Sequence, residues 1–499
     1  MLPGPCLQPT AAAAPPHLPR AGARRTMPAV SDARPDLDLL FSPRSVAVVG
    51  ASTNVDSPGH DYVRSLREFG FAGPVYPINP KATEIAGYRA YPSLADIPGP
   101  VDLVISCIPA EGVLDLIDQC SGGKAKFLHL FTARFSETGD ERAAALEREV
   151  AARARAAGVR ILGPNGMGVY HPAGGIAFRP DLPKAAGGVA FLSQSGNNAV
   201  EVAIRGAARG LKFGKVANYG NGLDITPAEL FRYLADDPAT EVIGAYIEGV
   251  PDGRALFEAV RLAAARKPVI IHKAGRTRAG ARSASSHTAA LAGSRELWSA
   301  ALRQAGAVEA RSQEQLLDLL TAAALLGRPR GRRVAVVGGG GGRSVQSADA
   351  CEENGLDVVP LPAAVRERVR ERAPFLADWV QNPVDQSILA GSGLSSNALL
   401  ELIVESGAYD MAIANVGEEW FFGRPDAEAR LRHACQRLAS IAERSPIPVA
   451  VVLGATETPV AWQRQLVDAI RDEFVAKGLA VFPSVERAAF ALARLAPPR

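Results

Sequence analysis

Short, largely apolar runs, several of them ending at glycine or small polar residues, recur along this chain and constrain its fold more than any other feature. The runs occupy residues 45–50, 73–80, 101–109, 188–192, 242–247 and 334–337. A continuous apolar run of this length that ends at a turn is typical of a strand buried on both faces of a parallel sheet. Helical segments, such as residues 61–69 and 199–208, separate several of the runs. This alternation predicts doubly wound α/β units, which bind ligands beyond the carboxyl ends of their strands.

The size and charge of the chain exclude several classes of protein. Its 499 residues, 47% of them hydrophobic, are enough for roughly three domains. A formal net charge of +3 is close to neutral for this length and implies no nucleic-acid partner. No apolar run reaches the roughly 18 residues of a membrane span, so no membrane partner is expected. The five cysteines lack metal-ligand spacing, which predicts no metal site and favours a reducing, cytoplasmic compartment.

The first 36 residues differ in composition from the rest. They are rich in proline and alanine, and they contain no acidic residue before Asp32. Because the segment has no hydrophobic period, residues 1–36 are expected to be a disordered extension. A transit peptide has a similar excess of arginine over acidic residues. We favour the simpler interpretation that the chain starts at Met27 rather than at Met1.

The first α/β unit favours coenzyme A over NAD as its ligand. The first run leads into Gly50-Ala51-Ser52-Thr53-Asn54 and lacks the G-x-G-x-x-G spacing of dinucleotide sites. The second run ends in Asn79-Pro80-Lys81, where an NAD site would place an acidic residue for the ribose hydroxyls. Both differences disfavour an NAD-dependent dehydrogenase. A lysine here suits the additional 3′-phosphate of CoA, although a helix-capping turn with a solvated lysine remains the alternative.

The second α/β unit contains a candidate anion site. The run at 188–192 leads into a turn of small hydroxylated residues, Ser193 to Asn198, and then into a helix. The free N–H groups and the dipole of a helix start favour a bound anion, although a capped helix without a ligand is an equal alternative. Asp224 and Glu248 follow strands of this unit, so either carboxylate could accept an imidazole N–H.

The third α/β unit has an unusual run of glycines. The strand at 334–337 is followed by five glycines, Gly338 to Gly342, and by a helix expected from Val345. Successive glycines allow a close backbone approach to a ligand, and the helix start offers N–H donors. The spacing does not fit a Walker A loop. Residues 382–385, Asn-Pro-Val-Asp, are a turn signal.

His287 is the candidate nucleophile. It lies in a run of small residues, 285–293, after the basic, glycine-containing segment 273–283. Small neighbours permit close approach to another surface, and the nearby cations suit an anionic reactant. A histidine in this setting can accept and transfer a phosphoryl group. A solvated surface loop is the alternative for these residues taken alone.

Together these motifs resemble the nucleoside-diphosphate-forming acyl-CoA synthetases, the superfamily of succinyl-CoA synthetase and ADP-forming acetyl-CoA synthetase. The similarity is carried by residues 50–52, 163–168, 193–196, 246–249 and 286–293. The chain has Ala289 where the family usually has glycine, which adds a methyl group beside the histidine. The resemblance implies three consecutive α/β domains, namely a Rossmann-like CoA-binding domain at 37–172, a flavodoxin-like domain with the phosphohistidine loop at 185–326, and a flavodoxin-like ligase-CoA domain at 332–496.

The resemblance also implies roles for single residues. Those that would line the CoA site are Gly50, Ser52, Lys81, Pro109 and Asn165. Those that would bind phosphate at two helix starts are Ser193, Ser195 and Gly196 in the second domain, and Gly340, Gly341 and Gly342 in the third. His287 would be phosphorylated, Glu248 would hold the other ring nitrogen, and Asp224 would be a second carboxylate in the cycle.

The implied function is that of a CoA-binding, phosphohistidine-forming subunit of an acyl-CoA synthetase, which converts a carboxylate, CoA and ATP to acyl-CoA, ADP and phosphate. About 165 residues follow the second unit, and their pattern predicts one more α/β domain. No long segment then remains for an ATP-grasp fold. The resemblance therefore implies a separate ATP-grasp β-type subunit that binds ATP and Mg²⁺. The alternative function is a non-catalytic CoA-binding or acyl-CoA-binding regulatory module. The motifs do not select one carboxylic acid.

Overall fold

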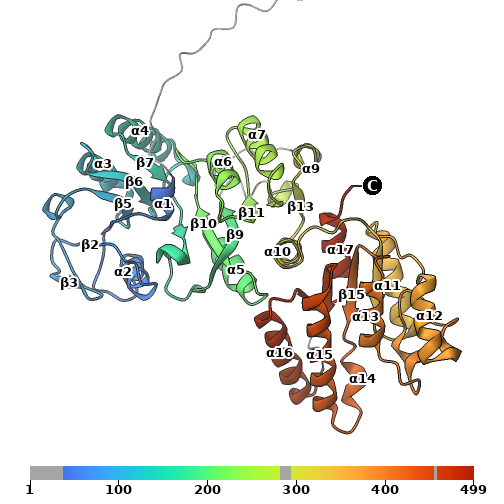
Figure 1. Ribbon diagram of the computed structural model, residues 1–499. Helices are drawn as coiled ribbons and strands as arrows, with labels where there is room; N and C mark the ends of the chain where they lie inside the picture. Colours follow the sequence, from blue (N-terminus) through green and yellow to red (C-terminus); the bar gives the residue numbers. More distant parts are fainter. Residues whose placement is uncertain (1–36, 281, 283–293, 455–457, 499) are drawn as a thin grey trace, which may run out of the picture. The chain divides into compact units, whose positions relative to one another are not determined.

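The computed structural model describes residues 37–280, 282, 294–454 and 458–498. The described residues form three principal sheets, which follow one another along the chain (Figure 1). The expected N-terminal extension at 1–36 lies outside the described residues. No helix within the described ranges has the length and apolarity needed to cross a membrane.

The first sheet has five parallel strands in the order β2-β1-β5-β6-β7. The strands are β1 (Val46–Val49), β2 (Val75–Ile78), β5 (Val101–Ser106), β6 (Ala125–Leu130) and β7 (Arg160–Leu162), and β3 (Glu84–Ile85) and β4 (Tyr88–Arg89) form a separate hairpin. The helical elements are α1 (Asp38–Phe41), α2 (Pro58–Glu68), η1 (Leu94–Asp96), η2 (Ala110–Gly112), α3 (Val113–Cys120), η3 (Ser136–Thr138) and α4 (Glu141–Ala157). Every residue of β5 is buried, as a strand covered on both faces requires. The strands predicted here are confirmed.

The second sheet has six strands in the order β13-β12-β11-β9-β10-β8. The strands are β8 (Gly168–Tyr170), β9 (Ala186–Ser193), β10 (Phe213–Asn218), β11 (Val242–Ile247), β12 (Val269–Lys273) and β13 (Val308–Ala310). The helices are η4 (Pro172–Gly174), α5 (Gly196–Ala207), α6 (Pro227–Asp236), α7 (Gly253–Ala264), α9 (Arg295–Gln304) and α10 (Gln313–Leu325). All neighbours are parallel except β8 and β10. Strand β8 lies before residue 172 but pairs with β10 of this second sheet. The domain boundary expected at residue 172 stays a prediction.

The third sheet has four parallel strands in the order β14-β15-β16-β17. The strands are β14 (Val334–Val337), β15 (Met411–Asn415), β16 (Val449–Val452) and β17 (Val481–Phe482). The helices are α11 (Gly341–Glu353), α12 (Ala363–Arg372), η5 (Pro374–Leu376), η6 (Gln386–Leu389), α13 (Ser396–Glu405), α14 (Glu419–Phe422), α15 (Ala427–Arg444), α16 (Ala461–Ala476) and α17 (Val485–Leu495). The helix expected from Val345 begins earlier, at Gly341. Because the first N–H groups of a helix lack intrahelical acceptors, Gly341 and Gly342 present free N–H donors at this helix start.

A charge network joins helices of the second and third α/β units. Asp318 of α10 is 3% exposed and accepts hydrogen bonds from Arg209 of α5 and from Arg487 of α17. Both arginines also pair with Glu314, one turn earlier on α10. Because a buried carboxylate is stable only with hydrogen-bonding partners, these residues fix α17 against α10.

The turn at residues 163–168 connects the first two sheets. The N–H of Asn165 donates to the Thr132 carbonyl beyond β6, and the N–H of Asn221 donates to the Pro164 carbonyl. His129 of β6 lies under the turn, with Nε2 2.8 Å from the carbonyl oxygen of Gly166. Burial lowers the pKa of His129 to about 4, so the ring is neutral and donates this hydrogen bond. The turn is thus held by main-chain groups that follow β6 and β10 and by the side chain of His129.

We expect Gly168→Ala to destabilise the protein by more than about 2 kcal/mol, by adding steric overlap to the strain of a positive φ. The residue has φ +86°, and a Cβ there would lie 2.6 Å from the His129 ring. Gly122→Ala is the matched control because Gly122 has φ +64° and a Cβ there would meet nothing within 4 Å. Urea unfolding of both variants measures the difference. Equal losses of stability would contradict the packing of His129 against Gly168.

Candidate active site

Two cavities meet at the turn that connects the first two sheets. A cavity of about 690 Å³ lies at the carboxyl edge of the first sheet. A second cavity of about 600 Å³ lies at the carboxyl edge of the second sheet. Asn165 and Gly196 line both cavities. Asn165 has a positive φ of 57°, which turns the backbone sharply at this junction.

The start of α5 forms one wall of the second cavity. Ser195 caps the helix by accepting a hydrogen bond from the N–H of Asn198, and Gly196 begins it. A Cβ on Gly196 would lie 2.8 Å from the Met167 side chain, so glycine is needed for this close approach. The first turn of a helix offers N–H donors and a positive dipole end, which together suit a phosphate. Ser193 is fully buried, and its hydroxyl donates to the Ser195 carbonyl.

Gln194 connects this helix start to the end of β11. Its Oε1 accepts hydrogen bonds from the N–H groups of Glu248 and Gly249, at 2.8 and 3.1 Å. The side chain is 6% exposed, so the contact is shielded from water. The two neighbouring strand ends are thereby held in register. Our interpretation of the sequence missed this residue, although it stands inside the Ser-Gln-Ser-Gly motif.

Glu248 follows β11 and lines the second cavity, as expected from its position after a buried strand. It is 9% exposed. Burial is the main cause that raises the pKa values of Tyr219 and Tyr246. The nearby negative charge of Glu248 is the second cause. Both phenols therefore stay neutral, and Tyr246 lines the cavity beside Glu248.

Lys273, the last residue of β12, connects the carboxyl ends of β11 and β12. Its side chain is 1% exposed, and Nζ donates to the carbonyls of Glu248 (2.6 Å) and Ala274. Nζ also lies 5.1 Å from the centre of the Trp298 ring. Burial is the main cause that lowers the pKa of Lys273, to about 8. Lys273 was predicted only as part of a basic segment, and its burial could not be read from the local sequence.

The expected CoA residues lie at the carboxyl edge of the first sheet. Gly50 follows β1 with φ +84°, and a Cβ there would lie 2.9 Å from the Cys107 carbonyl oxygen. Asn79 connects the ends of β1 and β2 because its amide donates to the Ala51 carbonyl and accepts from the N–H of Lys81. The Lys81 side chain is exposed. Ser52 accepts a hydrogen bond from the N–H of Asn54.

The remaining two CoA candidates, Pro109 and Asn165, line the first cavity, whereas Gly50, Ser52 and Lys81 do not. Arg134 and Arg142 also line it and bring positive charge to its wall. Neither arginine was predicted, because both come after the end of β6 in the sequence and belong to no recognisable short motif. Glu111 also lines the cavity, so the cleft is partly apolar and carries an excess of one positive charge.

The structure does not bring every predicted residue to the junction. Asp224 accepts hydrogen bonds from Arg160 and from the N–H of Ile161, both at 2.8 Å, and does not line the second cavity. Gly340 caps α11, and Gly341 and Gly342 form its first turn, but none of the three lines either cavity. His287 and Ala289 lie outside the described residues. Gly280, which shortly precedes His287 in the sequence, does line the second cavity.

Two family models match the units that form these cavities. The CoA binding domain matches residues 44–172, and the succinyl-CoA ligase like flavodoxin domain matches residues 186–323. The α subunit of ADP-forming acetate–CoA ligase I from Pyrococcus furiosus is 32% identical over 466 residues, which are 92% of this chain and 97% of that subunit. The chain belongs to the ADP-forming acetyl-CoA synthetase family.

Further comparisons agree with this membership. The solved structure of dinucleotide-forming acetyl-coenzyme A synthetase 1 from Ca. Korarchaeum cryptofilum, in complex with phosphate and ADP, has a TM-score of 0.78 and 30% identity, and covers 92% of this chain and 96% of that chain. The ADP-forming acetate–CoA ligase I from Archaeoglobus fulgidus is 38% identical over 352 residues, which are 70% of this chain but only 50% of that ligase. This chain therefore spans about half of the A. fulgidus protein.

Family membership confirms the resemblance, the α/β fold class and CoA as a ligand of the first domain. It favours the ligase subunit over a regulatory module. The roles of single residues and the domain boundaries stay predictions. Within the described ranges, no group of three or more His, Cys, Asp or Glu residues could hold a metal ion.

We expect the titration of Lys273 to increase the free energy of unfolding as the pH rises from about 8 to about 10.5. The native pKa of about 8 lies below the ordinary value of 10.5, so in this window the unfolded chain binds the extra proton. The gain relative to Lys273→Met is at most about 3–4 kcal/mol. Urea unfolding of both proteins at several pH values measures it. A stability difference independent of pH would contradict the low pKa.

Proposed function

We propose that this chain is the CoA-binding, phosphohistidine-forming subunit of a cytoplasmic acyl-CoA synthetase. The reaction joins a carboxylate and CoA at the expense of ATP, and it releases ADP and phosphate. The observation that carries the proposal is the junction of two cavities at Asn165 and Gly196. One cavity belongs to the edge of the CoA-binding domain, and the other contains Glu248 and a helix start suited to phosphate. A CoA thiol and a phosphorylated group can meet at this junction.

In the proposed cycle, the imidazole of His287 takes the terminal phosphoryl group of ATP, and ADP leaves. The substrate carboxylate attacks the phosphorus of phosphohistidine, the N–P bond breaks and an acyl phosphate forms. The CoA thiol, after losing its proton to solvent, attacks the acyl carbonyl, and phosphate leaves. Ser195 and Gly196 stabilise the phosphoryl group at the start of α5. Glu248 accepts the N–H of His287 and stabilises the positive charge on the ring.

The first domain is proposed to hold CoA with Gly50, Ser52, Lys81, Pro109 and Asn165. The glycine allows the nucleotide to approach the backbone, and Lys81 pairs with its additional phosphate. Asn165 lies nearest to the junction and is assigned to the thiol end. The glycines Gly340 to Gly342 are proposed to receive the phosphoryl group at a second helix start.

The nucleotide is assigned to a separate ATP-grasp β-type subunit with Mg²⁺. This assignment is supported by the likeness to two α subunits of ADP-forming acetate–CoA ligases from P. furiosus, which are 35% and 32% identical to this chain. The name of these relatives, α subunit, implies a partner subunit for them. The proposed enzyme is a hetero-oligomer.

We expect His287→Asn to abolish phosphorylation of the chain by ATP and the partner subunit. Asparagine removes the nucleophilic ring nitrogen and keeps a similar size. The measurement is acid-labile, base-stable label from ATP, with CoA binding as the control for folding. Full labelling of His287→Asn would reject His287 as the nucleophile. Absence of label from the wild-type protein with every ATP-grasp partner tested would reject the proposed function.

We expect Glu248→Gln to slow phosphorylation by roughly 10²–10³-fold, by analogy with removal of one preorganised stabilising group. Asp224→Asn is the matched control because its carboxylate pairs with Arg160, away from the second cavity. It should lower the free energy of unfolding by about 1–3 kcal/mol and leave the rate unchanged. Single-turnover labelling and urea unfolding of both variants separate the two roles. The opposite pattern would make Asp224 the partner of the imidazole.

A further inference from the structure

The hydrogen bonds of Gln194 fix the orientation of its side-chain amide. Its Oε1 atom accepts from the N–H groups of Glu248 and Gly249, at 2.8 and 3.1 Å. The nitrogen of a side-chain amide donates hydrogen bonds and accepts none, so only the oxygen can face these two N–H groups. The Nε2 atom, on the other side of the amide, is therefore directed away from the end of β11.

The Nε2 atom of Gln194 is a donor that faces the second cavity. Gln194 lines this cavity, although the residue is only 6% exposed. Within the described ranges, no acceptor takes a hydrogen bond from Nε2, and neighbouring atoms do not seal this nitrogen off. A largely buried N–H group without a protein acceptor is satisfied when a ligand supplies one. The cavity wall thus contains a polar group that points to a ligand.

The main chain on both sides of Gln194 is also held by hydrogen bonds. The backbone N–H of Gln194 donates to the Tyr246 carbonyl at 3.1 Å. The hydroxyl of Ser193 donates to the Ser195 carbonyl at 2.6 Å, just before α5 begins. The amide therefore needs little reorganisation when negative charge develops beside it. A donor fixed in this way is suited to stabilise an oxyanion.

The proposed cycle forms an oxyanion for which no donor has been assigned. When the CoA thiolate attacks the acyl phosphate, a C–S bond forms and an electron pair of the C=O bond moves to the oxygen. The pair returns as the C–O bond to phosphate breaks, and phosphate leaves. The phosphoryl oxygens are assigned to the start of α5, but the carbonyl oxygen has no partner there. A preorganised N–H group at this oxygen lowers the barrier to thioester formation.

We propose that Gln194 is a catalytic residue of thioester formation, in which Nε2 donates to the acyl carbonyl oxygen as it becomes an oxyanion. The assignment rests on the proposed function, because it needs an acyl phosphate in the second cavity. Asn165 and Gly196 line both cavities, so the thiol can reach the cavity that Gln194 lines. The same amide holds Glu248, which is assigned to phosphorylation of the imidazole, through its oxygen.

Two variants of Gln194 test the donor. Gln194→Glu keeps an oxygen for the N–H groups of Glu248 and Gly249 but replaces the donor by a negative charge, whereas Gln194→Met removes the donor without adding a charge. We expect both to slow acetyl-CoA formation from acetyl phosphate and CoA by roughly 10²–10³-fold, as removal of one oxyanion donor does. Phosphorylation by ATP should be slowed at least about tenfold less than this, because its oxygens have other donors.

Both half-reactions are measured in single turnovers of the complex with the partner subunit. The inference is overturned if either variant forms acetyl-CoA at the wild-type rate. A wild-type rate for Gln194→Met alone would show that the added charge slows Gln194→Glu, and a wild-type rate for Gln194→Glu alone would show that only the acceptor matters. Equal slowing of phosphorylation and thioester formation would also overturn it, since a purely structural role in holding Glu248 predicts that result.

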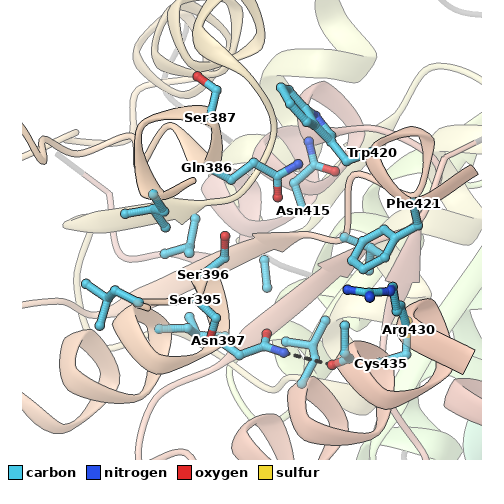
Figure 2. Close-up of a pocket in the computed structure, with 18 of the residues that line it drawn as sticks. Gln386, Ser387, Ser395, Ser396, Asn397, Asn415, Trp420, Phe421, Arg430 and Cys435 are labelled. Carbon is cyan, nitrogen blue, oxygen red and sulfur yellow. Dashed lines mark hydrogen bonds between the residues drawn. The ribbon is translucent and has the colours of Figure 1, made fainter. Parts of the chain in front are cut away.

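Asn397→Asp is the matched control because it changes a side-chain amide to a carboxylate in the wall of a different cavity. This cavity of about 460 Å³ lies in the third α/β unit, where the Asn397 amide donates to the Ala434 carbonyl of α15 at 2.8 Å (Figure 2). The variant loses this donor, so it should unfold at a lower urea concentration but keep both half-reactions at the wild-type rate. If the wild-type complex catalyses neither half-reaction, the proposed function fails and this inference fails with it. If the wild type catalyses both and the Gln194 variants match it, only this inference fails.

Discussion

The close contact of two backbones at the 163–168 turn is the constraint on which the rest of the site depends. A Cβ on Gly220 would lie 2.1 Å from the Pro164 carbonyl oxygen, and one on Gly166 would lie 2.8 Å from the Asn218 carbonyl oxygen. No side chain fits between the first and second sheets here. Because main-chain hydrogen bonds fix both sides, Asn165 has a single position. That position places it in the wall of both cavities, so the fold itself creates the junction.

The strands were predictable from the sequence because a buried parallel strand is a local pattern. The predicted strands at 242–247 and 334–337 have the same ends in the structure. The position of Glu248 followed from the same pattern, because a residue directly after a buried strand lies at the carboxyl edge of the sheet. The helix start at Gly196 also needed only the local order of strand, small residues and helix. Short-range rules therefore identified the edge at which the site lies.

Other features depend on residues that meet only in the folded chain. Asp224 and Glu248 were predicted in similar positions, yet Asp224 pairs with Arg160, which is distant in sequence. Lys273 belongs to a segment that the sequence marks as basic, but its side chain is buried and donates to the carbonyls of Glu248 and Ala274. Gln194 acts through two N–H groups of another strand. Such pairings are set by tertiary contacts, which no window of the sequence contains.

Helix α10 connects the second α/β unit, which contains the active-site cavity, with the third α/β unit. Helix α5 begins in that cavity and pairs with α10 through Arg209, while α17 pairs with α10 through Arg487 and contacts β15. The side chain of Glu314 is 42% exposed, so salt screens its ion pairs, whereas the side chain of Asp318 is only 4% exposed and its ion pairs are screened less. Moving α17 away would leave Asp318 with Arg209 alone, and loss of a partner of a buried charge costs about 3–5 kcal/mol. Displacement of α17 is therefore opposed by the pairing of Asp318 in the interior.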